Sequence, residues 1–309
     1  MNKKCIVTGG AGFIASHLVD RLIEKGYEVA VIDNLSTGNK DNLNLKADFY
    51  NFDIQDQKIS EIFKKVKPEI VFHYAAQIDV RKSVDDPLES AKTNILGSLN
   101  ILENCKKFGV KKIVFASSGG AIYGEAEVIP TSEDYSPKPV SPYGIEKLVF
   151  EHYLYFYKKE YNLDYLSLRF ANIYGPRQNS KGEAGVVAIF CDKMMRGEKI
   201  IINGDGKQTR DFVFVEDVIS ANILGIENNK SGVFNVGTSK ETDVNDIFCE
   251  LDKLFDSKIQ KIHGPQKAGE QKRSCLDFGK IKKDFGWEPK YNIEKGLLKT
   301  QEWFKENFR

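Results

Sequence analysis

The chain has 309 residues, with 45 lysines and arginines against 44 aspartates and glutamates, for a formal net charge of +1. This balance favours neither a nucleic acid nor an anionic membrane as a partner. The five cysteines (Cys5, Cys105, Cys191, Cys249 and Cys275) contain no C-x-x-C pair, so neither a disulfide framework nor a metal site is predicted. Without a secretory leader pattern or a long apolar run, the sequence predicts a reduced, soluble, cytoplasmic protein.

Residues 4–33 predict a strand, a helix and a second strand in immediate succession. Cys5–Thr8 is a short apolar run with β-branched residues, typical of a buried strand, and Glu28–Ile32 is another. Between them, apolar positions recur near helical spacing as far as Gly26, a suitable helix C-cap. In such a βαβ unit, a glycine-rich turn like Gly9–Ala15 indicates a dinucleotide site.

The glycine-rich turn has the residue types that a pyrophosphate requires. Gly9 can adopt turn angles that a Cβ would forbid, and Gly12 lets backbone N–H groups approach a phosphate at the positive end of the helix. Ala15 occupies the third position of the pattern, where it packs the helix on the strand. Asp33 can accept hydrogen bonds from ribose hydroxyls and would repel a 2′-phosphate, which favours NAD over NADP. The alternative is a glycine-rich turn that binds no ligand.

Strands and helices continue to alternate after this unit. Further buried strands are predicted over residues 48–52, 69–73, 112–116 and 165–170, with long helices over 87–108 and after Ser141. Strict alternation predicts a doubly wound parallel sheet, the Rossmann type of α/β fold.

The helix over 87–108 is amphipathic, and its apolar face is predicted to contain Ala91, Ile95, Leu99 and Leu102. Asn94 lies near this face, where it either satisfies a buried backbone group or reaches the active-site region. Asp53 follows the third strand, where it either contacts the adenine amino group or caps the next helix.

The pattern changes around Asn172, where a polar loop begins and strict alternation stops, although Val233–Val236 is predicted to return to the sheet. We therefore expect two parts. The NAD-binding Rossmann domain is predicted to span residues 1–171 and about 211–240, and a smaller interwoven lobe is predicted to comprise residues 172–210 and 241–309.

Tyr143 and Lys147 are four residues apart at the start of a predicted helix, so their side chains share a face. The pair comes after the strand end at Ser117-Ser118, where ligands bind in parallel sheets. A tyrosine is a poor base at neutral pH, but a nearby ammonium and a cationic nicotinamide ring favour the phenolate. We therefore predict that Tyr143 removes a proton from a sugar hydroxyl during oxidation.

On these residues, the chain resembles the extended short-chain dehydrogenase/reductase family, and within it the nucleotide-sugar 4-epimerases of the UDP-galactose/UDP-N-acetylglucosamine type. The resemblance covers essentially the whole chain. Its motifs are Gly9–Ala15, Asp33, Ala75-Ala76-Gln77, Tyr143 with Lys147, Leu168–Arg177, Arg210-Asp211-Phe212 and Gly269-Glu270.

The resemblance implies an NAD-dependent isomerase that interconverts C4 epimers of UDP-hexoses through a transient 4-keto sugar and bound NADH. Expected substrates are UDP-glucose with UDP-galactose, and also UDP-N-acetylglucosamine with its C4 epimer. Gly120-Ala121 stands where related dehydratases carry an acid, which argues against loss of water. The alternatives are a UDP-uronate epimerase or decarboxylase on the same scaffold, or a dinucleotide sensor without catalysis. The intact Tyr143–Lys147 pair argues against the sensor.

The resemblance also assigns residues. The family's catalytic hydroxyl falls at Gly119 here. Either Ser118 takes its role, through a loop adjustment or a water, or Tyr143 works with less help, and the catalytic residues are assigned as Tyr143, Lys147 and Ser118. Implied cofactor contacts are Gly9, Gly12, Phe13, Ile14, Asp33, Asn34, Ser36, Thr37, Gly38, Asp53, Ile54, Ala75, Ala76, Gln77, Asn94, Ser117, Tyr143, Lys147 and Phe170. Implied substrate contacts are Ser118, Gly119, Tyr143, Asn172, Val186, Val187, Phe190, Arg210, Lys267, Glu270 and Ser274.

Several substrate assignments have structural alternatives. Arg210 matches a diphosphate ligand, as does Asn172, but Arg210 could instead pair with Asp211 in a strand. Glu270 matches the acid that binds the uridine ribose, and Lys267 makes a looser phosphate contact. The apolar run Val186–Phe190 packs on uracil or within the core. Ser274 is small enough to admit an acetamido group, unless it only faces a strand neighbour.

The resemblance further implies a homodimer formed by the helices over 87–108 and 145–161. On the second helix, an aromatic stripe suits such an interface and would equally suit a core within one chain: Phe150, Tyr153, Leu154 and Tyr157.

Overall fold

The computed structural model describes residues 3–181, 185–266 and 271–308. The chain divides into two compact units. The first unit comprises Met1–Ile122, Pro139–Arg169 and Ile219–Phe234, and the second comprises Tyr123–Lys138, Phe170–Val218 and Asn235–Arg309. Residues 123–138, 170–171, 211–218 and 235–240, which were expected in the NAD-binding domain, therefore group with the second unit.

A seven-stranded sheet with the order β11-β6-β5-β4-β1-β2-β3 forms the centre of the first unit. Its strands are β1 (Lys4–Thr8), β2 (Glu28–Ile32), β3 (Asp48–Tyr50), β4 (Ile70–His73), β5 (Lys112–Ser118), β6 (Asp164–Phe170) and β11 (Gly232–Val236). The registered pairs β1–β2, β1–β4, β2–β3 and β4–β5 are parallel. The chain reverses its winding direction between β1 and β4, so the doubly wound prediction is confirmed and a ligand crevice is expected at the carboxyl ends of these strands.

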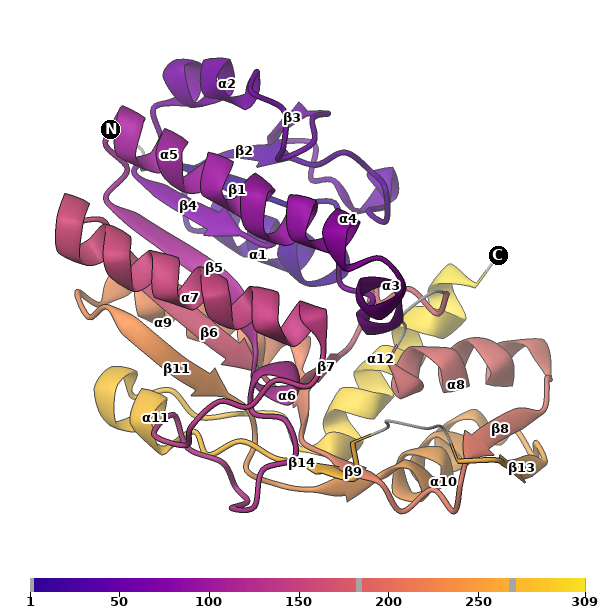
Figure 1. Cartoon of the computed structure of the whole chain (residues 1–309). Helices are drawn as coiled ribbons and strands as arrows, with labels where there is room; N and C mark the ends of the chain where they lie inside the picture. The colour runs from indigo at the N-terminus through magenta and orange to yellow at the C-terminus, as the bar shows by residue number, and fades with distance from the viewer. Residues whose placement is uncertain (1–2, 182–184, 267–270, 309) are drawn as a thin grey trace. The chain divides into compact units, whose positions relative to one another are not determined.

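Helices cover both faces of this sheet. On one face lie α2 (Ile59–Val66), α5 (Ser98–Phe108) and α7 (Pro142–Tyr161), and on the other lies α1 (Phe13–Glu24) (Figure 1). Shorter elements of the same unit are a 3₁₀ turn (Lys40–Asn42), α3 (Val80–Asp85), α4 (Pro87–Ala91) and α6 (Gly119–Ile122), whereas α9 (Val215–Glu227) crosses the boundary between the units.

The aromatic stripe of α7 packs within the chain. Phe150, Leu154 and Tyr157 are buried in the core formed with α2, α5 and the sheet, and Tyr153 is partly buried against it. Burial of these side chains therefore requires no second subunit.

The long helix predicted over 87–108 is interrupted by a π-helical segment, Lys92–Gly97, between α4 and α5. The predicted apolar face was wrong in part. Leu102 is buried and Leu99 packs against the core, as predicted, but Ala91 and Ile95 are only half-buried, whereas Asn94 is 5% exposed. A π turn holds more residues than an α turn. It therefore rotates the following positions away from the phase that a regular helix predicts.

The second unit is built from short sheets and helices. Its strands are β7 (Asn172–Tyr174), β8 (Ile200–Asn203), β9 (Thr209–Arg210), β10 (Phe212–Phe214), β12 (Thr242–Asp243), β13 (Lys261–Gly264) and β14 (Arg273–Ser274). They pair as β10 with β7, β13 with β8, and β12-β9-β14. The helices are α8 (Val186–Arg196), α10 (Val244–Phe255), α11 (Gly279–Phe285) and α12 (Ile293–Asn307).

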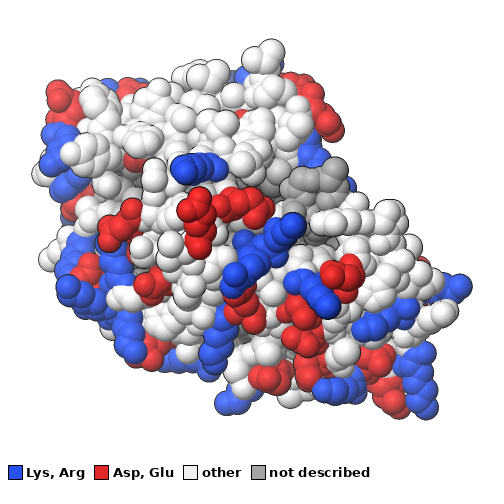
Figure 2. Space-filling view, turned by 60° about the horizontal axis from the view of Figure 1, so that its bottom comes forward, with Lys and Arg blue, Asp and Glu red and all other residues white. Residues whose placement is uncertain are grey.

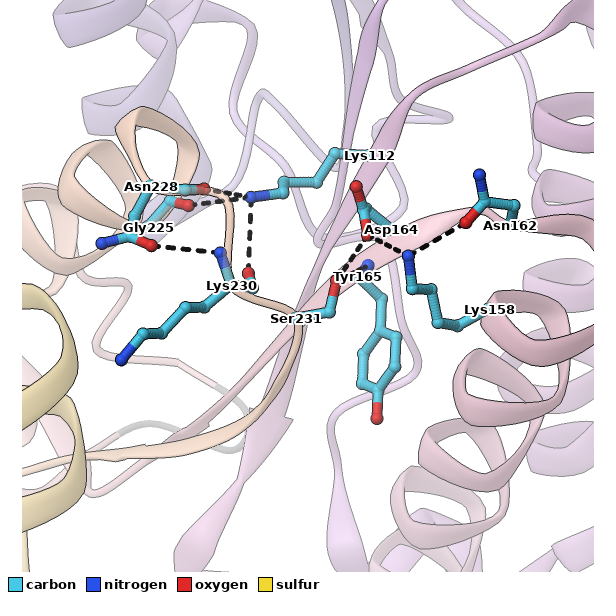
Figure 3. A network of polar contacts seen from close by, with 9 residues as sticks. All are labelled: Lys112, Lys158, Asn162, Asp164, Tyr165, Gly225, Asn228, Lys230 and Ser231. Atoms are coloured by element: carbon cyan, nitrogen blue, oxygen red, sulfur yellow. Dashed lines mark hydrogen bonds and ion pairs between the residues drawn. The ribbon is translucent and has the colours of Figure 1, made fainter.

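Lys112, at the start of β5, ties the amino end of the sheet to the segment after α9. Its Nζ donates hydrogen bonds to the carbonyl oxygens of Gly225 (3.2 Å), Asn228 (2.5 Å) and Lys230 (3.5 Å) (Figure 3). These carbonyls lie at and beyond the last turn of α9, where a helix leaves acceptors without intrahelical donors. Burial lowers the pKa of Lys112, and the three acceptors compensate for the lost hydration of its charge.

Charged side chains of both signs are interspersed on the face drawn in Figure 2. On helices of the described chain, several charged side chains three residues apart form ion pairs, such as Lys106 with Glu103 at 2.8 Å. Among the described residues, no helix has the length and apolar character needed to cross a bilayer.

Candidate active site

The loops that follow β1 and β4 are in close contact, backbone to backbone, at Gly9 and Ala75. Gly9 has a φ of +71°, and its N–H donates to the carbonyl of Ile32 at 2.8 Å. A Cβ at Gly9 would lie 2.7 Å from the backbone nitrogen of Ala75. Only glycine therefore fits this turn, for reasons of both conformation and space.

Helix α1 begins without a side-chain cap. Gly12 is its N-cap residue, no side-chain hydrogen bond caps the helix, and no acidic residue lies in the first turn. Phe13 and Ile14 are the first two helical residues and are half-buried. A helix start of this kind offers backbone N–H groups and a positive dipole end to an anion. Together with the glycine turn, these residues fit the pyrophosphate of a dinucleotide.

Asp33 organises the loop around this turn. It is 7% exposed, and its carboxylate accepts hydrogen bonds from the backbone N–H groups of Ala11 (3.0 Å) and Leu35 (2.8 Å). Gly38 lies so close that a Cβ there would be 3.0 Å from Asp33 Oδ1. A carboxylate has about four acceptor positions, so Asp33 retains capacity for ribose hydroxyls. Its cofactor role stays a prediction, as do those of the exposed Ser36 and Thr37.

Asp53 does not cap the next helix, which was its alternative assignment, because α2 begins at Ile59 without a side-chain cap. It accepts hydrogen bonds from Asn34 Nδ2 (2.7 Å) and from the backbone N–H of Gln55 (2.8 Å). Ile54 is 4% exposed and belongs to the core. These contacts hold the 53–55 turn against the loop after β2, and adenine contacts by Asn34, Asp53 and Ile54 remain predictions.

Asn94 satisfies a buried backbone segment, as its structural alternative predicted. Its Oδ1 accepts from the N–H of Gln77 at 2.8 Å, and its Nδ2 donates to the carbonyl of the same residue at 2.9 Å. It thereby fixes the loop after β4, where Ala75 and Ala76 are half-buried. A contact of Asn94 with the cofactor stays a prediction.

His73 is a buried residue that the sequence analysis did not single out. Thr8 Oγ1 accepts from the backbone N–H groups of Tyr74 and Ala75, both at 3.2 Å, and lies 2.8 Å from His73 Nδ1. Thr8 therefore donates its hydroxyl proton to Nδ1, and Nε2–H donates to Ser98 Oγ at 2.8 Å. Burial lowers the pKa of His73 to about 3, so this chain of hydrogen bonds contains a neutral imidazole.

Tyr143 and Lys147 lie in the first turns of α7, which Ser141 caps by accepting from the N–H of Gly144 at 3.2 Å. Lys147 is 5% exposed, and its Nζ donates to the carbonyl of Ala116 at 2.8 Å. The same nitrogen lies 5.5 Å from the centre of the Tyr143 ring. The structure therefore brings the predicted pair together at the carboxyl end of β5.

Burial has the largest effect on the pKa values of Tyr143 and Lys147. Burial lowers the pKa of Lys147 to about 8, although the charges of Glu146 and Glu151 oppose this. Burial, and then the charge of Glu146, raises the pKa of Tyr143. Burial therefore opposes the phenolate in the protein alone, and the predicted lowering of the pKa of Tyr143, which also requires the cationic nicotinamide ring, stays a prediction.

The serines at the end of β5 point to different partners. Ser117 is buried, and its Oγ donates to Glu151 Oε1 at 2.7 Å, so its hydroxyl is engaged inside the unit. Ser118 is half-buried, and its Oγ accepts from the N–H of Ala121 at 3.3 Å, capping α6, which begins at Gly119. The Ser117 hydroxyl is therefore bound to Glu151, and the role assigned to Ser118 stays a prediction.

Glu151 and Arg169 form a buried ion pair that the sequence analysis did not identify. Arg169 Nη2 lies 2.6 Å from Glu151 Oε2, with side-chain exposures of 6% and 4%. Glu151 Oε1 also accepts from Ser167 at 2.9 Å and from Ser117. The pair fixes α7 to β5 and β6, and the only sequence signal was the position of Arg169 within a family motif.

In the second unit, Arg210 and Ser274 are direct register partners on β9 and β14. Arg210 Nη1 donates to the carbonyl of Thr209 at 2.8 Å. The carboxylate of Asp211 is engaged elsewhere: it accepts from the backbone N–H and the hydroxyl of Thr238 and from the N–H of Leu276. The diphosphate role of Arg210 stays a prediction.

The remaining predicted substrate contacts are divided between surface and core. Asn172 is exposed on β7, and Val186 is half-buried at the start of α8. Val187 and Phe190 are buried in the second unit, where the Phe190 ring packs at 6.1 Å on Phe248, so core packing explains them. Phe170 is also buried, at the end of β6. Lys267 and Glu270 lie outside the described residues.

A sequence model of the NAD dependent epimerase/dehydratase family matches residues 5–237. The chain belongs to this family. The strand order and the glycine turn described above are those of a dinucleotide-binding α/β fold.

Solved structures of family members align along the full chain. A UDP-glucose 4-epimerase of Thermotoga maritima, solved with UDP-glucose, is 50% identical with a TM-score of 0.97, covering 99% of this chain and 100% of that one. A Thermus thermophilus UDP-glucose 4-epimerase, solved with NAD, is 39% identical with a TM-score of 0.94, covering 98% and 99%. A UDP-N-acetylglucosamine 4-epimerase of Methanobrevibacter ruminantium, solved with UDP-N-acetylmuramic acid, is 36% identical with a TM-score of 0.94, covering 99% of both chains.

Proposed function

We propose that this protein is a UDP-hexose 4-epimerase that uses NAD. The observation that carries the proposal is the Tyr143–Lys147 pair, with Lys147 Nζ fixed on the carbonyl of Ala116 at the end of β5. The first unit also provides a glycine turn and a helix start that fit a dinucleotide. The similarity to UDP-glucose 4-epimerases extends through both units.

The residues of the first unit have distinct tasks in this proposal. NAD, when bound, supplies reversible oxidation of the sugar at C4. Tyr143 removes the proton from the 4-hydroxyl and returns it, and Ser118 donates a hydrogen bond to the same oxygen. Lys147 orients the cofactor ribose and places a positive charge beside Tyr143. The C4 epimer forms if the 4-keto sugar rotates and presents the opposite face of C4 before C4 is reduced again.

The residues of the second unit bind the rest of the substrate in this proposal. Arg210 and Asn172 hold the diphosphate, because a guanidinium makes paired hydrogen bonds to phosphate oxygens. Glu270 binds the uridine ribose, with Lys267 as a further phosphate contact, and Val186 packs on the uracil. Ser274 lines the sugar pocket and leaves space for a 2-acetamido group.

The decisive experiment is incubation of the purified protein with UDP-glucose, UDP-galactose or UDP-N-acetylglucosamine, with and without added NAD, followed by separation of the sugars. We expect the C4 epimer from each substrate. Formation of a pentose from UDP-glucuronate, without any C4 epimer from the hexoses, would instead establish the decarboxylase alternative. For a Tyr143→Phe variant, which should not form the epimer, Tyr155→Phe is the control, because Tyr155 lies on α7 like Tyr143 and is 55% exposed.

We also propose a homodimer in the cytoplasm, formed through the helices over 87–108 and 145–161. Large apolar side chains remain exposed on these helices: Leu88 at 77%, Leu96 at 60% and Phe156 at 48%. Burial of such side chains is a usual source of interface stability. Sedimentation should give a dimer that Leu96→Glu dissociates and Leu45→Glu, in an exposed loop, does not. A monomeric wild type would remove this proposal.

A further inference from the structure

Glu146 is a buried carboxylate between the two proposed catalytic positions of α7. It is 3% exposed. Its Oε2 accepts hydrogen bonds from Ser90 Oγ at 2.8 Å and from Asn94 Nδ2 at 2.6 Å. Both donors belong to the helix that runs beside α7, at the π-helical segment and the turn before it. A carboxylate is rarely buried at this depth without such partners.

Asn94 extends this contact to the loop after β4. The same amide that donates to Glu146 also exchanges two hydrogen bonds with the backbone of Gln77, one through the N–H and one through the carbonyl. Glu146, Asn94 and Gln77 therefore form a continuous polar connection from α7 to this loop. Removal of Glu146 would leave the amide without the acceptor that fixes its orientation.

We propose that Glu146 is a positioning residue for the reaction: it fastens α7, with Tyr143 and Lys147, to the cofactor loop at Gln77 and places a negative charge beside both. The inference rests on the proposed function for the roles of Tyr143 and Lys147. The fastening itself depends only on the contacts within the first unit.

The charge of Glu146 acts on both neighbours in the same direction. It raises the pKa of Lys147 against the effect of burial, and it adds to burial in raising the pKa of Tyr143. Other ionisable groups on the surrounding elements are exposed or paired. They include Glu89 with Lys92 on the neighbouring helix, the exposed Arg81, Lys82 and Asp85 on α3, the neutral His73 on β4, and Glu151 with Arg169. Asp79 and Asp86 cap α3 and α4 by accepting from the backbone N–H groups of Lys82 and Glu89.

Two variants separate the two effects. Glu146→Gln keeps the size and an acceptor oxygen for Asn94 but removes the charge, whereas Glu146→Leu removes both. Loss of the charge should shift both limbs of the kcat/KM profile to lower pH, by about 1 unit. Loss of the acceptor should release the Gln77 loop. Glu160→Gln, on the exposed end of the same helix, is the matched control.

The fastening is tested without substrate or cofactor, by hydrogen–deuterium exchange of the peptide that contains residues 74–79. We expect at least about tenfold faster exchange in Glu146→Leu and rates near wild type in Glu146→Gln and Glu160→Gln. Unchanged exchange in a folded Glu146→Leu variant would overturn the fastening. If that variant does not fold, Glu146→Met gives the same test, because it keeps the length of the side chain and removes the acceptor while Asn94 and Ser90 stay intact.

The electrostatic part is tested by the pH profile of Glu146→Gln with UDP-glucose. A profile that superimposes on wild type would overturn it, whereas a purely structural role would lower the rate at every pH without shifting the limbs. If wild type shows no epimerisation, the proposed function fails, and the exchange experiment still decides whether Glu146 fastens the loop.

Discussion

Tyr143 and Lys147 show how burial sets the starting state of a single site. Burial raises the pKa of Tyr143 and lowers that of Lys147 to about 8, so desolvation opposes the charged form of each side chain. The protein alone therefore holds Tyr143 as a stable phenol. We infer that a second positive charge beside the ring is required before the phenolate forms, which couples proton transfer to the oxidised cofactor.

Replacement of Tyr143 by Phe should preserve folding and NAD binding but reduce kcat by roughly 10²–10⁴, the range for loss of a general base. The ring and its packing are retained, so only the proton-accepting oxygen is lost. Steady-state assays with UDP-galactose measure the loss in kcat, and titration with NAD measures cofactor binding. A variant with near-normal turnover would exclude Tyr143 as the base.

The pKa of Lys147 also predicts how stability depends on pH. Because its folded-state pKa, about 8, lies below its ordinary value of 10.5, the folded protein binds fewer protons than the unfolded chain between these values. Its contribution therefore becomes more favourable as the pH rises from about 8 to 10.5 and is least favourable below that window.

Urea unfolding of wild type and Lys147→Met tests this contribution. The difference in unfolding free energy should move in favour of wild type as the pH rises through the window. Lys159→Met, at an exposed position of the same helix, should show no such trend. A difference that stays constant with pH would mean that Lys147 is not desolvated in the folded protein.

At the scale of whole elements, local patterns were predicted well and tertiary contacts were not. The boundaries of β1, α1 and β2 are within about two residues of those predicted from the apolar runs and Gly26. The signals for these elements are contained in neighbouring residues of the sequence. The phase of the 87–108 helix was wrong, because its π-helical segment accompanies contacts of Asn94 with residues distant in sequence. His73, Glu146 and Glu151 were missed for the same reason: only folding supplies their partners.

The ion pair between Glu151 and Arg169 gives an element-scale prediction, because it joins α7 to β6. Arg169→Met should reduce the free energy of unfolding by about 3–5 kcal/mol, since it leaves the buried carboxylate without its cation. The double variant Glu151→Leu with Arg169→Met should be less destabilised than Arg169→Met alone. Chemical denaturation of wild type, the single variant and the double variant measures these free energies of unfolding. If the double variant is less stable than Arg169→Met, the unpaired charge of Glu151 is not the cause of the destabilisation.

At the scale of the whole molecule, each unit carries part of the proposed chemistry. The first contains the dinucleotide turn and the Tyr143–Lys147 pair, and the second contains Arg210 and Ser274 on neighbouring strands. Sequence reasoning assigned the first group from physical requirements of the cofactor, since glycine turns and helix ends have few alternatives. The second group was assigned by resemblance, because a short strand with an arginine has many ordinary explanations.

Substrate range should depend on Ser274 in the second unit. The side chain is small and 8% exposed, and it pairs in register with Arg210, the proposed diphosphate ligand. A larger side chain at this position would overpack its surroundings, at a cost of about 1–3 kcal/mol, and would fill space that we assign to a 2-acetamido group. Ser274→Tyr should therefore lower kcat/KM for UDP-N-acetylglucosamine by about tenfold or more relative to UDP-galactose.

The measurement is the ratio of the two kcat/KM values in wild type, Ser274→Tyr and Ser274→Ala. The alanine variant is the control, because it keeps the pocket open and should keep the wild-type ratio. Equal losses on both substrates in Ser274→Tyr would indicate general disruption of β14. An unchanged ratio in a folded, active Ser274→Tyr variant would mean that the acetamido group does not approach this strand, and another residue would have to set the size of the pocket.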